Sequence, residues 1–464
     1  MIRFIKATDA AWMLVESAEQ PVHVACMAIC SRPPGAPRGF VREMVEEWRQ
    51  HRHFAPPFNY VYRPWPFPAW RELPDEAVDL EYHFRHKALP EPGSERDLGM
   101  LVSQLHSHAL DRRRPLWECH LIEGLEHDRF AIYLKVHHSQ IDGIGGIRLI
   151  RRVFSADPHA RGHQPPWAVG LTSARPAGAA SSRRAPGWAE QLQTQALATQ
   201  PVLKLVSRLA REAARREHPE TALPFNAPKT VLNGRIHGPR RFATQHYALD
   251  RIKRLAKSAG VTVNDVFLAI CAGALRRYLE ESGKLPRQTL SAGLPVSVRP
   301  AEDASVGNAI SLILAKLYTD VADPLERLQA IAGSVRAAKQ QLEQLPKSAI
   351  DQYTLLVNGP YLLQLAMGLG GYGRPLYSLL ISNVPGPAES LYFNGARMDE
   401  IYPISLLFNG QALNISVVSY AGQFNLGFTG CRDSLPSMQK LAVYTGEALQ
   451  ELELALGATG RNAA

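Results

Sequence analysis

The chain has 464 residues, of which 45% are hydrophobic and 20% are charged, and its net charge is +9. This composition is typical of a globular protein of two or three domains and excludes a largely disordered chain. The positive charge favours an anionic partner, such as a phosphorylated cofactor or a lipid surface. Because the sequence has no zinc-finger spacing and no aromatic and basic motif, we expect no nucleic acid partner.

The N-terminal segment and the cysteines bear on where the protein works. Asp9 and Glu16 follow the first residues closely, so this segment lacks the long apolar core of a signal peptide. The five cysteines are odd in number and scattered through apolar segments, which indicates free thiols in a reducing compartment. No segment reaches the roughly 18 consecutive apolar residues of a membrane span. We therefore expect a cytoplasmic protein whose membrane contact is at most peripheral.

A predicted strand over residues 130–138 ends in two histidines. Its even positions read Phe, Ile, Leu, Val and His, so a period of two places His138 on the apolar face and points His137 the other way. Asp142 and Gly143 then form a tight turn, and a segment with helical periodicity follows. A neutral imidazole at a strand end can accept a proton, which makes His138 a candidate general base. The alternative for a core-facing histidine is a purely structural role.

A connector follows this first part of the chain. Residues 157–187 are rich in Pro, Ala, Gly, Ser and Arg, which indicates a flexible linker without fixed structure. Over 202–215 apolar and basic residues occupy opposite sides of a predicted helix. This basic helix either docks on an anionic lipid surface or simply covers a domain. We expect an N-terminal subdomain at 1–156, a connector at 157–240 and a C-terminal subdomain at 241–464.

The second half alternates helices and strands. Periodicity predicts a helix over 263–279 and helices across 324–345. Strands are expected over 413–420 and 424–429, joined as a hairpin by a short turn that contains glycine. The charge-poor segment 354–373 is expected to form a buried or surface-dipping helix. Such segments suit a core and also the wall of a lipid tunnel.

Several short motifs, in order along the chain, resemble those of one known family. His137-His138-x-x-x-Asp142-Gly143 resembles the HHxxxDG signature of the CoA-dependent acyltransferase superfamily, which peptide-condensation domains share. The other motifs resemble blocks of bacterial wax ester synthase/diacylglycerol acyltransferases. They are Pro115, Leu116 and Trp117 of a PLW block, Asn264 and Asp265 of an ND motif, Arg299 at the end of a PVSVR block, and Ser382 and Asn383 of an SNVPGP block.

The resemblance implies a fold and an activity. The fold would be an α/β (α+β) sandwich of two chloramphenicol-acetyltransferase-like subdomains, with the active site in a tunnel at their interface. The activity would be transfer of a long-chain acyl group from acyl-CoA, a co-substrate, to a fatty alcohol or a diacylglycerol, without a permanently bound cofactor. Two alternatives stay open: a non-catalytic lipid-surface or carrier-binding protein of this fold, and an acyltransferase for another small acceptor.

The resemblance also implies roles for single residues. His138 would be the general base, His137 would orient it or pack beside it, and Asp142 would hold the loop, with Arg299 as its expected partner. The oxyanion and substrate-binding candidates, for which capping or turn chemistry is the alternative, are Asn264, Asp265, Ser382 and Asn383. Pro115, Leu116 and Trp117 would support the wall of the acyl pocket. We expect no metal site, because binding by His106, His108, His137 and His138 would need matched ligand spacing and an acidic or Cys partner, for which Asp142 is the candidate.

Overall fold

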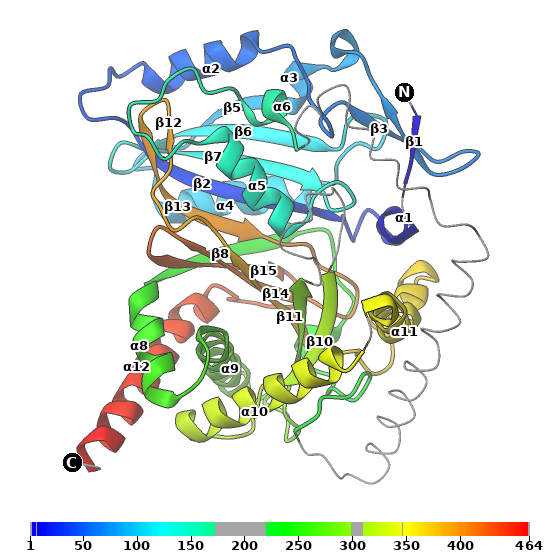
Figure 1. The fold of residues 1–464 in the computed structure, drawn as a ribbon, viewed down its shortest axis with the longest axis vertical. Coiled ribbons are helices and arrows are strands. Elements are labelled where there is room, and N and C mark those ends of the chain that lie inside the picture. The colour runs from blue at the N-terminus through cyan, green and yellow to red at the C-terminus, as the bar shows by residue number, and fades with distance from the viewer. Residues whose placement is uncertain (1, 6, 172–219, 298–309, 346, 463–464) are drawn as a thin grey trace.

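The computed structural model describes residues 2–5, 7–171, 220–297, 310–345 and 347–462. Two six-stranded sheets lie one beyond the other, and helices cover them (Figure 1). The N-terminal sheet has the order β12 (Tyr392–Phe393), β13 (Ala396–Ile404), β2 (His23–Ser31), β7 (Arg129–His137), β6 (Trp117–Leu125), β5 (Phe84–Ala88). The C-terminal sheet has the order β10 (Ile310–Lys316), β9 (Ser291–Ser297), β11 (Leu379–Pro385), β14 (Leu413–Tyr420), β15 (Gln423–Cys431), β8 (Arg240–Ala248).

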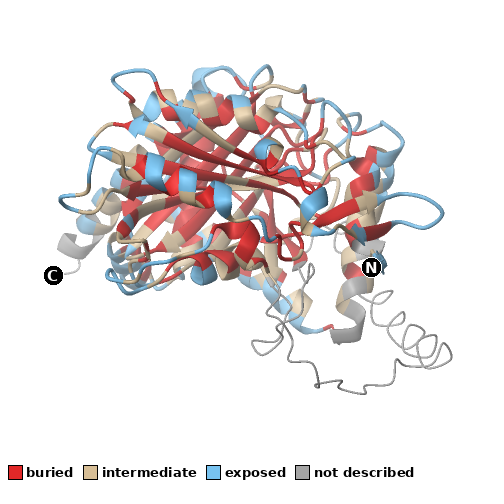
Figure 2. Cartoon of the chain, turned by 90° about the horizontal axis from the view of Figure 1, so that it is seen from above, coloured by how far each residue is buried: buried red, intermediate tan, exposed pale blue. Residues whose placement is uncertain are grey.

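A third sheet is small and lies at one side of the molecule (Figure 1). Its order is β1 (Ile2–Phe4), β4 (Ala69–Glu72), β3 (Tyr60–Arg63). The helices are α1 (Ala7–Val15), α2 (Phe40–Gln50), α3 (Leu80–His83), α4 (Glu95–Ser107), α5 (Gly143–Val153), α6 (Pro166–Val169), α8 (Leu249–Ala259), α9 (Val263–Glu281), α10 (Pro324–Glu343), α11 (Lys347–Ala366) and α12 (Lys440–Asn462). Buried residues fill the layers of strands, whereas the surrounding helices and loops expose their outer sides (Figure 2).

The two halves of the chain are interlocked. Strand β13 comes from the second half but pairs with β2 in the N-terminal sheet, where Ile401 lies opposite Ala28. The short strand β12 extends the same edge. A cut of the chain at residue 241 therefore does not separate the two sheets.

Part of the predicted linker belongs to the folded unit. Trp167 in α6 is fully buried, its ring stacks on that of Trp117 at 5.5 Å, and its Nε1 donates to the carbonyl of His51. The expectation of no fixed structure is therefore wrong for residues 157–171, because a buried tryptophan and hydrogen bonds such as that of the His163 N–H to Asn394 anchor a segment of linker composition. The predicted basic helix at 202–215 lies outside the described residues.

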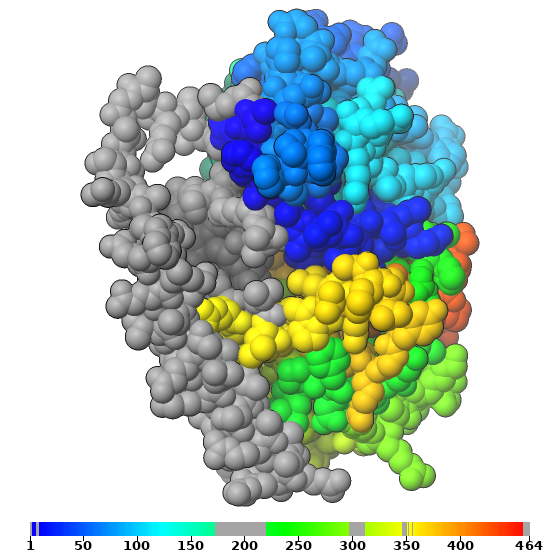
Figure 3. Space-filling view, turned by 90° about the vertical axis from the view of Figure 1, so that its right-hand side faces the viewer, coloured from blue at the N-terminus to red at the C-terminus, as the bar shows by residue number. Residues whose placement is uncertain are grey.

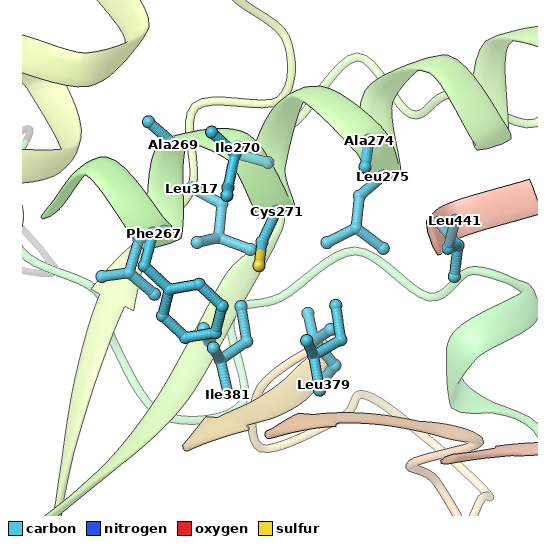
Figure 4. Packing of buried hydrophobic residues seen from close by; sticks show 14 of the residues in the cluster. Phe267, Ala269, Ile270, Cys271, Ala274, Leu275, Leu317, Leu379, Ile381 and Leu441 are labelled. Atoms are coloured by element: carbon cyan, nitrogen blue, oxygen red, sulfur yellow. The ribbon is translucent and has the colours of Figure 1, made fainter. Parts of the chain in front are cut away.

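Helix α9 is the centre of the C-terminal core. It confirms the helix predicted over 263–279, and its side chains Phe267, Cys271 and Leu275 pack with Leu379 and Ile381 of β11 (Figure 4). Because most of its surface is buried, this helix is apolar on most sides rather than on one stripe. In the described part of the chain no single helix has the length and apolarity to cross a membrane, although α8 and α9 pass that test together as a pair bent by 100°.

The predicted hairpin is confirmed. Strand β14 spans Leu413–Tyr420 and pairs antiparallel with β15. The two turn residues, Ala421 and Gly422, have φ values of 45° and 78°. Two successive residues with positive φ match the twist of the flanking strands, which is why a short turn with a glycine joins them.

Candidate active site

His138 lies in the turn directly after β7. Its Nδ1 is 3.0 Å from the carbonyl oxygen of Ile141. Because a carbonyl oxygen only accepts, Nδ1 carries the proton and the lone pair is on Nε2. Burial lowers the pKa of His138 below its usual 6.5, against the opposing effect of its backbone hydrogen bonds. The imidazole is therefore neutral at physiological pH and suited to accept a proton at Nε2.

An aromatic stack covers one face of this imidazole. The ring of Trp12, on α1, lies parallel to that of His138, with 5.1 Å between centroids and 8° between planes. Phe408 stacks in turn on Trp12 at 5.7 Å. Such stacking fixes the plane of a ring and excludes water from the covered face. The imidazole is thus held by a hydrogen bond in its plane and by an apolar surface above it.

His137 is fully buried. The alternation of strand residues therefore does not distinguish His138 from His137, contrary to the prediction from the sequence pattern. Strand β7 ends at His137, so His138 belongs to the turn, and the face of β7 opposite the predicted apolar one is buried as well. The backbone N–H of Ser139 donates to Nδ1 of His137 at 3.2 Å. The proton is therefore on Nε2, which faces the carboxylate of Glu16 at 3.6 Å.

Glu16 is a buried anion beneath the histidine loop. Its carboxylate accepts from Nε of Arg112 at 2.7 Å and from the backbone N–H of Val22 at 3.0 Å. Burial raises the pKa of Glu16, but the contacts with His137, Val22 and Arg112 outweigh it and lower this pKa to about 2. The carboxylate of Glu16 is ionised throughout the physiological range. Its contact with Nε2 of His137 holds that imidazole in place.

Asp142 and Gly143 begin helix α5. Asp142 is its N-cap, and its Oδ1 accepts from the N–H of Gly145 at 2.7 Å. A Cβ on Gly143 would lie 3.0 Å from a methyl group of Val384, a tight contact, so glycine allows the loop to approach β11 closely. The contact brings the HHxxxDG loop of the first half against the SNVPGP strand of the second. Arg299, the expected partner of Asp142, lies outside the described residues.

The candidates of the second half separate into two groups. Nδ2 of Asn383 donates to Oδ1 of Asn264 at 3.4 Å, so these two residues meet at the start of α9. Ser382, the neighbour of Asn383 on β11, points to the other face, toward the side of Val384. Asp265 closes a capping box with Thr262. Its carboxylate accepts from the backbone N–H and the hydroxyl of Thr262, so it serves the helix cap rather than an oxyanion.

The PLW block supports the histidine strand. The carbonyl of Leu116 accepts from the backbone N–H of His137 at 3.0 Å. Trp117 is fully buried, donates from Nε1 to the carbonyl of Phe58 at 2.8 Å and stacks on His83 at 4.5 Å. The first residue of the block, Pro115, accepts from the N–H of Trp117. These contacts are architectural, and a contribution to an acyl pocket stays a prediction.

Sequence reasoning missed several residues of the site: Trp12, Glu16, Arg112 and Ser139. One signal was present, because Trp12 and Glu16 are four residues apart, a spacing that places side chains on the same side of a helix. The contact between Glu16 and Arg112 joins residues 96 apart and has no local signal.

Nothing in the described ranges resembles a metal centre. Among those residues no group of three or more His, Cys, Asp or Glu side chains is arranged to hold a metal ion. The ring nitrogens of His106, a buried histidine of α4, bond to the hydroxyl of Tyr133 and the carbonyl of Ser405, each at 3.0 Å. These nitrogens thus serve packing within the protein.

Comparison with known proteins places this chain among acyltransferases. Residues 5–267 match the model of the wax ester synthase/diacylglycerol acyltransferase catalytic domain, and residues 306–453 match that of the WS/DGAT C-terminal domain. The O-acyltransferase WSD of Acinetobacter baylyi is 39% identical over 453 residues, with 97% of each chain covered. A Mycobacterium tuberculosis protein named provisionally as a diacylglycerol O-acyltransferase is 42% identical over 493 residues, again with 97% of each covered.

A solved structure agrees with the fold. The wax ester synthase/diacylglycerol acyltransferase of Marinobacter aquaeolei matches with a TM-score of 0.79 and 37% identity, over 98% of this chain and 100% of that one. The two-subdomain α/β fold expected from the sequence motifs is therefore confirmed.

Proposed function

Because the chain belongs to the wax ester synthase/diacylglycerol acyltransferase family and is an acyltransferase, we propose that it moves a long-chain acyl group from acyl-CoA to the hydroxyl of a fatty alcohol or a diacylglycerol. The products are a wax ester or a triacylglycerol and free CoA. The observation that carries the proposal is the state of His138, whose Nδ1 is bonded to a backbone carbonyl and whose Nε2 holds the lone pair.

The proposed mechanism is direct transfer. Nε2 of His138 takes the hydroxyl proton of the acceptor as its oxygen attacks the thioester carbonyl. The tetrahedral intermediate then collapses, the bond to sulfur breaks, and the imidazolium returns the proton to the departing thiolate. Atoms and charges balance without a covalent acyl-enzyme or a permanently bound cofactor. Acyl-CoA is accordingly a co-substrate.

The oxyanion needs a hydrogen-bond donor, and the structure favours Asn264 over Asp265. Asn383 donates to the carbonyl oxygen of the Asn264 amide, which leaves the NH2 group of Asn264 as a donor at the start of α9. The helix N-terminus adds a favourable field for negative charge. Ser382, on the face of β11 toward Gly143, is the second donor in this proposal. Asp265 instead fixes the first turn of α9.

We assign positioning roles to the residues beneath and beside the base. Glu16 holds His137, whose Nδ1 accepts from Ser139, and this chain of contacts shapes the turn that presents His138. Asp142 caps α5 and fixes the other end of the loop. His137 and Asp142 therefore act through the geometry of His138 rather than on the substrate.

We also propose that the enzyme works in the cytoplasm at the surface of a membrane or a lipid droplet. All five cysteines are free thiols, which suits a reducing compartment. The net charge of +9 suits an anionic surface, and the proposed acceptors are apolar.

The proposal is tested by incubating the purified protein with a long-chain acyl-CoA and a fatty alcohol, a diacylglycerol or no acceptor. Release of CoA thiol and formation of ester are followed together. We expect thiol and ester in equal amounts, dependent on the acceptor. Thiol release without an acceptor would indicate a hydrolase. No thiol release with either acceptor would favour the non-catalytic lipid-binding alternative or a different small acceptor.

A further inference from the structure

The small sheet carries large apolar side chains that point into solvent. Trp65 is 80% exposed, Phe4 76%, Phe67 68% and Ile2 50%. These four residues, which we call the apolar tip, come from β1 and from the loop between β3 and β4. Single exposed apolar residues are common on protein surfaces, but β1 pairs with β4, so these four large side chains lie on adjacent segments, and a group of this kind favours a binding surface.

The charged residues within the two segments of the apolar tip are all basic, and the nearest carboxylate on the same sheet, Glu72 at the end of β4, is part-buried. Arg3, Arg63 and Arg71 are exposed, whereas residues 2–5 and 63–71 contain no carboxylate. Nε of Arg63 donates to the carbonyl of Trp65 at 3.1 Å, which ties the basic group to the aromatic loop. Aromatic residues flanked by arginines suit the headgroup region of a phospholipid layer, where the rings enter the acyl boundary and the guanidinium groups meet phosphates.

The exposed apolar surface continues onto two helices. Met13 of α1 packs with Tyr60 and Trp70 of the small sheet, and Val15, the last residue of α1, belongs to an apolar cluster with α11. On the outer side of these helices Leu14 is 73% exposed and Leu363 is 59% exposed. Figure 3 shows this side of the molecule, where the β3–β4 region in blue, the N-terminal segment in dark blue and the end of α11 in yellow lie one below another.

Helix α1 connects this surface to the base. Leu14 on its outer side faces solvent, whereas Trp12 on its inner side stacks on His138. The exposed apolar surface and the reacting group are thus separated by the thickness of one helix.

We propose that the face formed by the apolar tip, α1 and α11 docks on a phospholipid surface, so that apolar substrates reach His138 from the lipid without crossing water. The inference rests on the proposed function, because only apolar substrates require such a route. It assigns the docking to described residues of the small sheet and not to the predicted basic helix. Arg3, Arg63 and Arg71 supply the attraction to anionic headgroups, and Trp65 and Phe67 enter the lipid.

The test measures binding of the full chain to phosphatidylcholine vesicles, with and without phosphatidylglycerol, by flotation. The Trp65→Ser/Phe67→Ser variant is expected to bind at least tenfold more weakly. The matched control is Val443→Ser/Leu454→Ser, which removes two exposed apolar residues from α12 on another part of the surface and should bind within twofold of the wild type. The Arg63→Gln/Arg71→Gln variant should lose the enhancement by phosphatidylglycerol.

Activity toward a water-soluble pair, a short-chain acyl-CoA and a short alcohol, separates docking from catalysis. We expect the apolar-tip variant to keep this activity and to lose transfer from vesicle-borne acceptors. Wild-type binding by the Trp65→Ser/Phe67→Ser variant would overturn the proposal, as would a wild type that transfers acyl groups but binds no vesicles. A wild-type dimer that this variant converts to monomers would assign the face to self-association and overturn it as well. An inactive chain with normal vesicle binding would contradict the proposed function alone.

Discussion

Replacing Glu16 by glutamine removes the buried charge beneath the histidine loop while keeping the shape of the side chain. The contacts with His137, Val22 and Arg112 lower the pKa of Glu16 from 4.5 to about 2. A difference of this size corresponds to about 3 kcal/mol of folding free energy at neutral pH. The side chain is only 6% exposed, so solvent screens little of it. We expect Glu16→Gln to lower the free energy of unfolding by about 2 to 3 kcal/mol.

The pH dependence of this loss is the sharper test. A carboxylate with a lowered pKa stabilises the fold fully above its unfolded pKa, near 4.5, and this stabilisation disappears as the pH falls toward 2. Urea unfolding of the wild type and of Glu16→Gln should therefore differ most at pH 6 to 7 and converge below pH 4.5. Glu46→Gln, at a side chain that is 59% exposed, is the matched control and should differ from the wild type by less than about 0.5 kcal/mol. A Glu16→Gln variant as stable as the wild type at pH 7, or a loss independent of pH, would refute the reasoning.

The other predictions concern the histidine loop. Trp12→Ala should lower the transfer rate about tenfold and Trp12→Phe much less, because phenylalanine keeps the stack on His138; equal rates for the two variants would remove its positioning role. Gly143→Ala should destabilise the fold by about 1 kcal/mol, because the added Cβ would press on a methyl group of Val384, and the same substitution made on a Val384→Ala background should cost less in thermal unfolding. Asp142→Ala should lose about 1 kcal/mol of stability and Asp142→Asn little, since asparagine also caps helices. The acidic limb of the rate should lie below pH 6.5, because burial lowers the pKa of His138 and the base stays neutral above it.

The periodicity of apolar residues predicted the helices and strands that form through contacts between nearby residues. Strand β14 and the start of α9 fall where the apolar pattern placed them, because hairpins and capped helices form through contacts a few residues apart. The insertion of β13 beside β2 was not predictable, since it joins segments more than 350 residues apart. The buried segment at Trp167 was missed for a related reason, because its anchoring contacts, such as that of His163 with Asn394, join residues far apart in the sequence.

The candidate site also has a part that short motifs predicted and a part that depends on distant contacts. The HHxxxDG motif proposed His138 and the loop around it as the site, and the ND and SNVPGP blocks proposed Asn264 and Asn383, two residues that the structure brings into contact. The motif did not reveal the surroundings of the histidines. Trp12 and Glu16 reach them from α1 and the residue after it, across more than 120 positions of sequence. Strand parity also misjudged the buried face, because both sides of a central strand are covered.

The central claim is that His138 is the general base of a direct acyl transfer. Acceptor-dependent release of CoA thiol by the wild type, by His138→Ala and by His108→Ala, at an exposed histidine, tests it most directly. We predict that His138→Ala loses about 10² to 10⁴-fold in rate while retaining the circular dichroism spectrum and unfolding midpoint of the wild type, and that His108→Ala retains both fold and rate. Transfer by a folded His138→Ala protein at a rate near that of the wild type would contradict the claim.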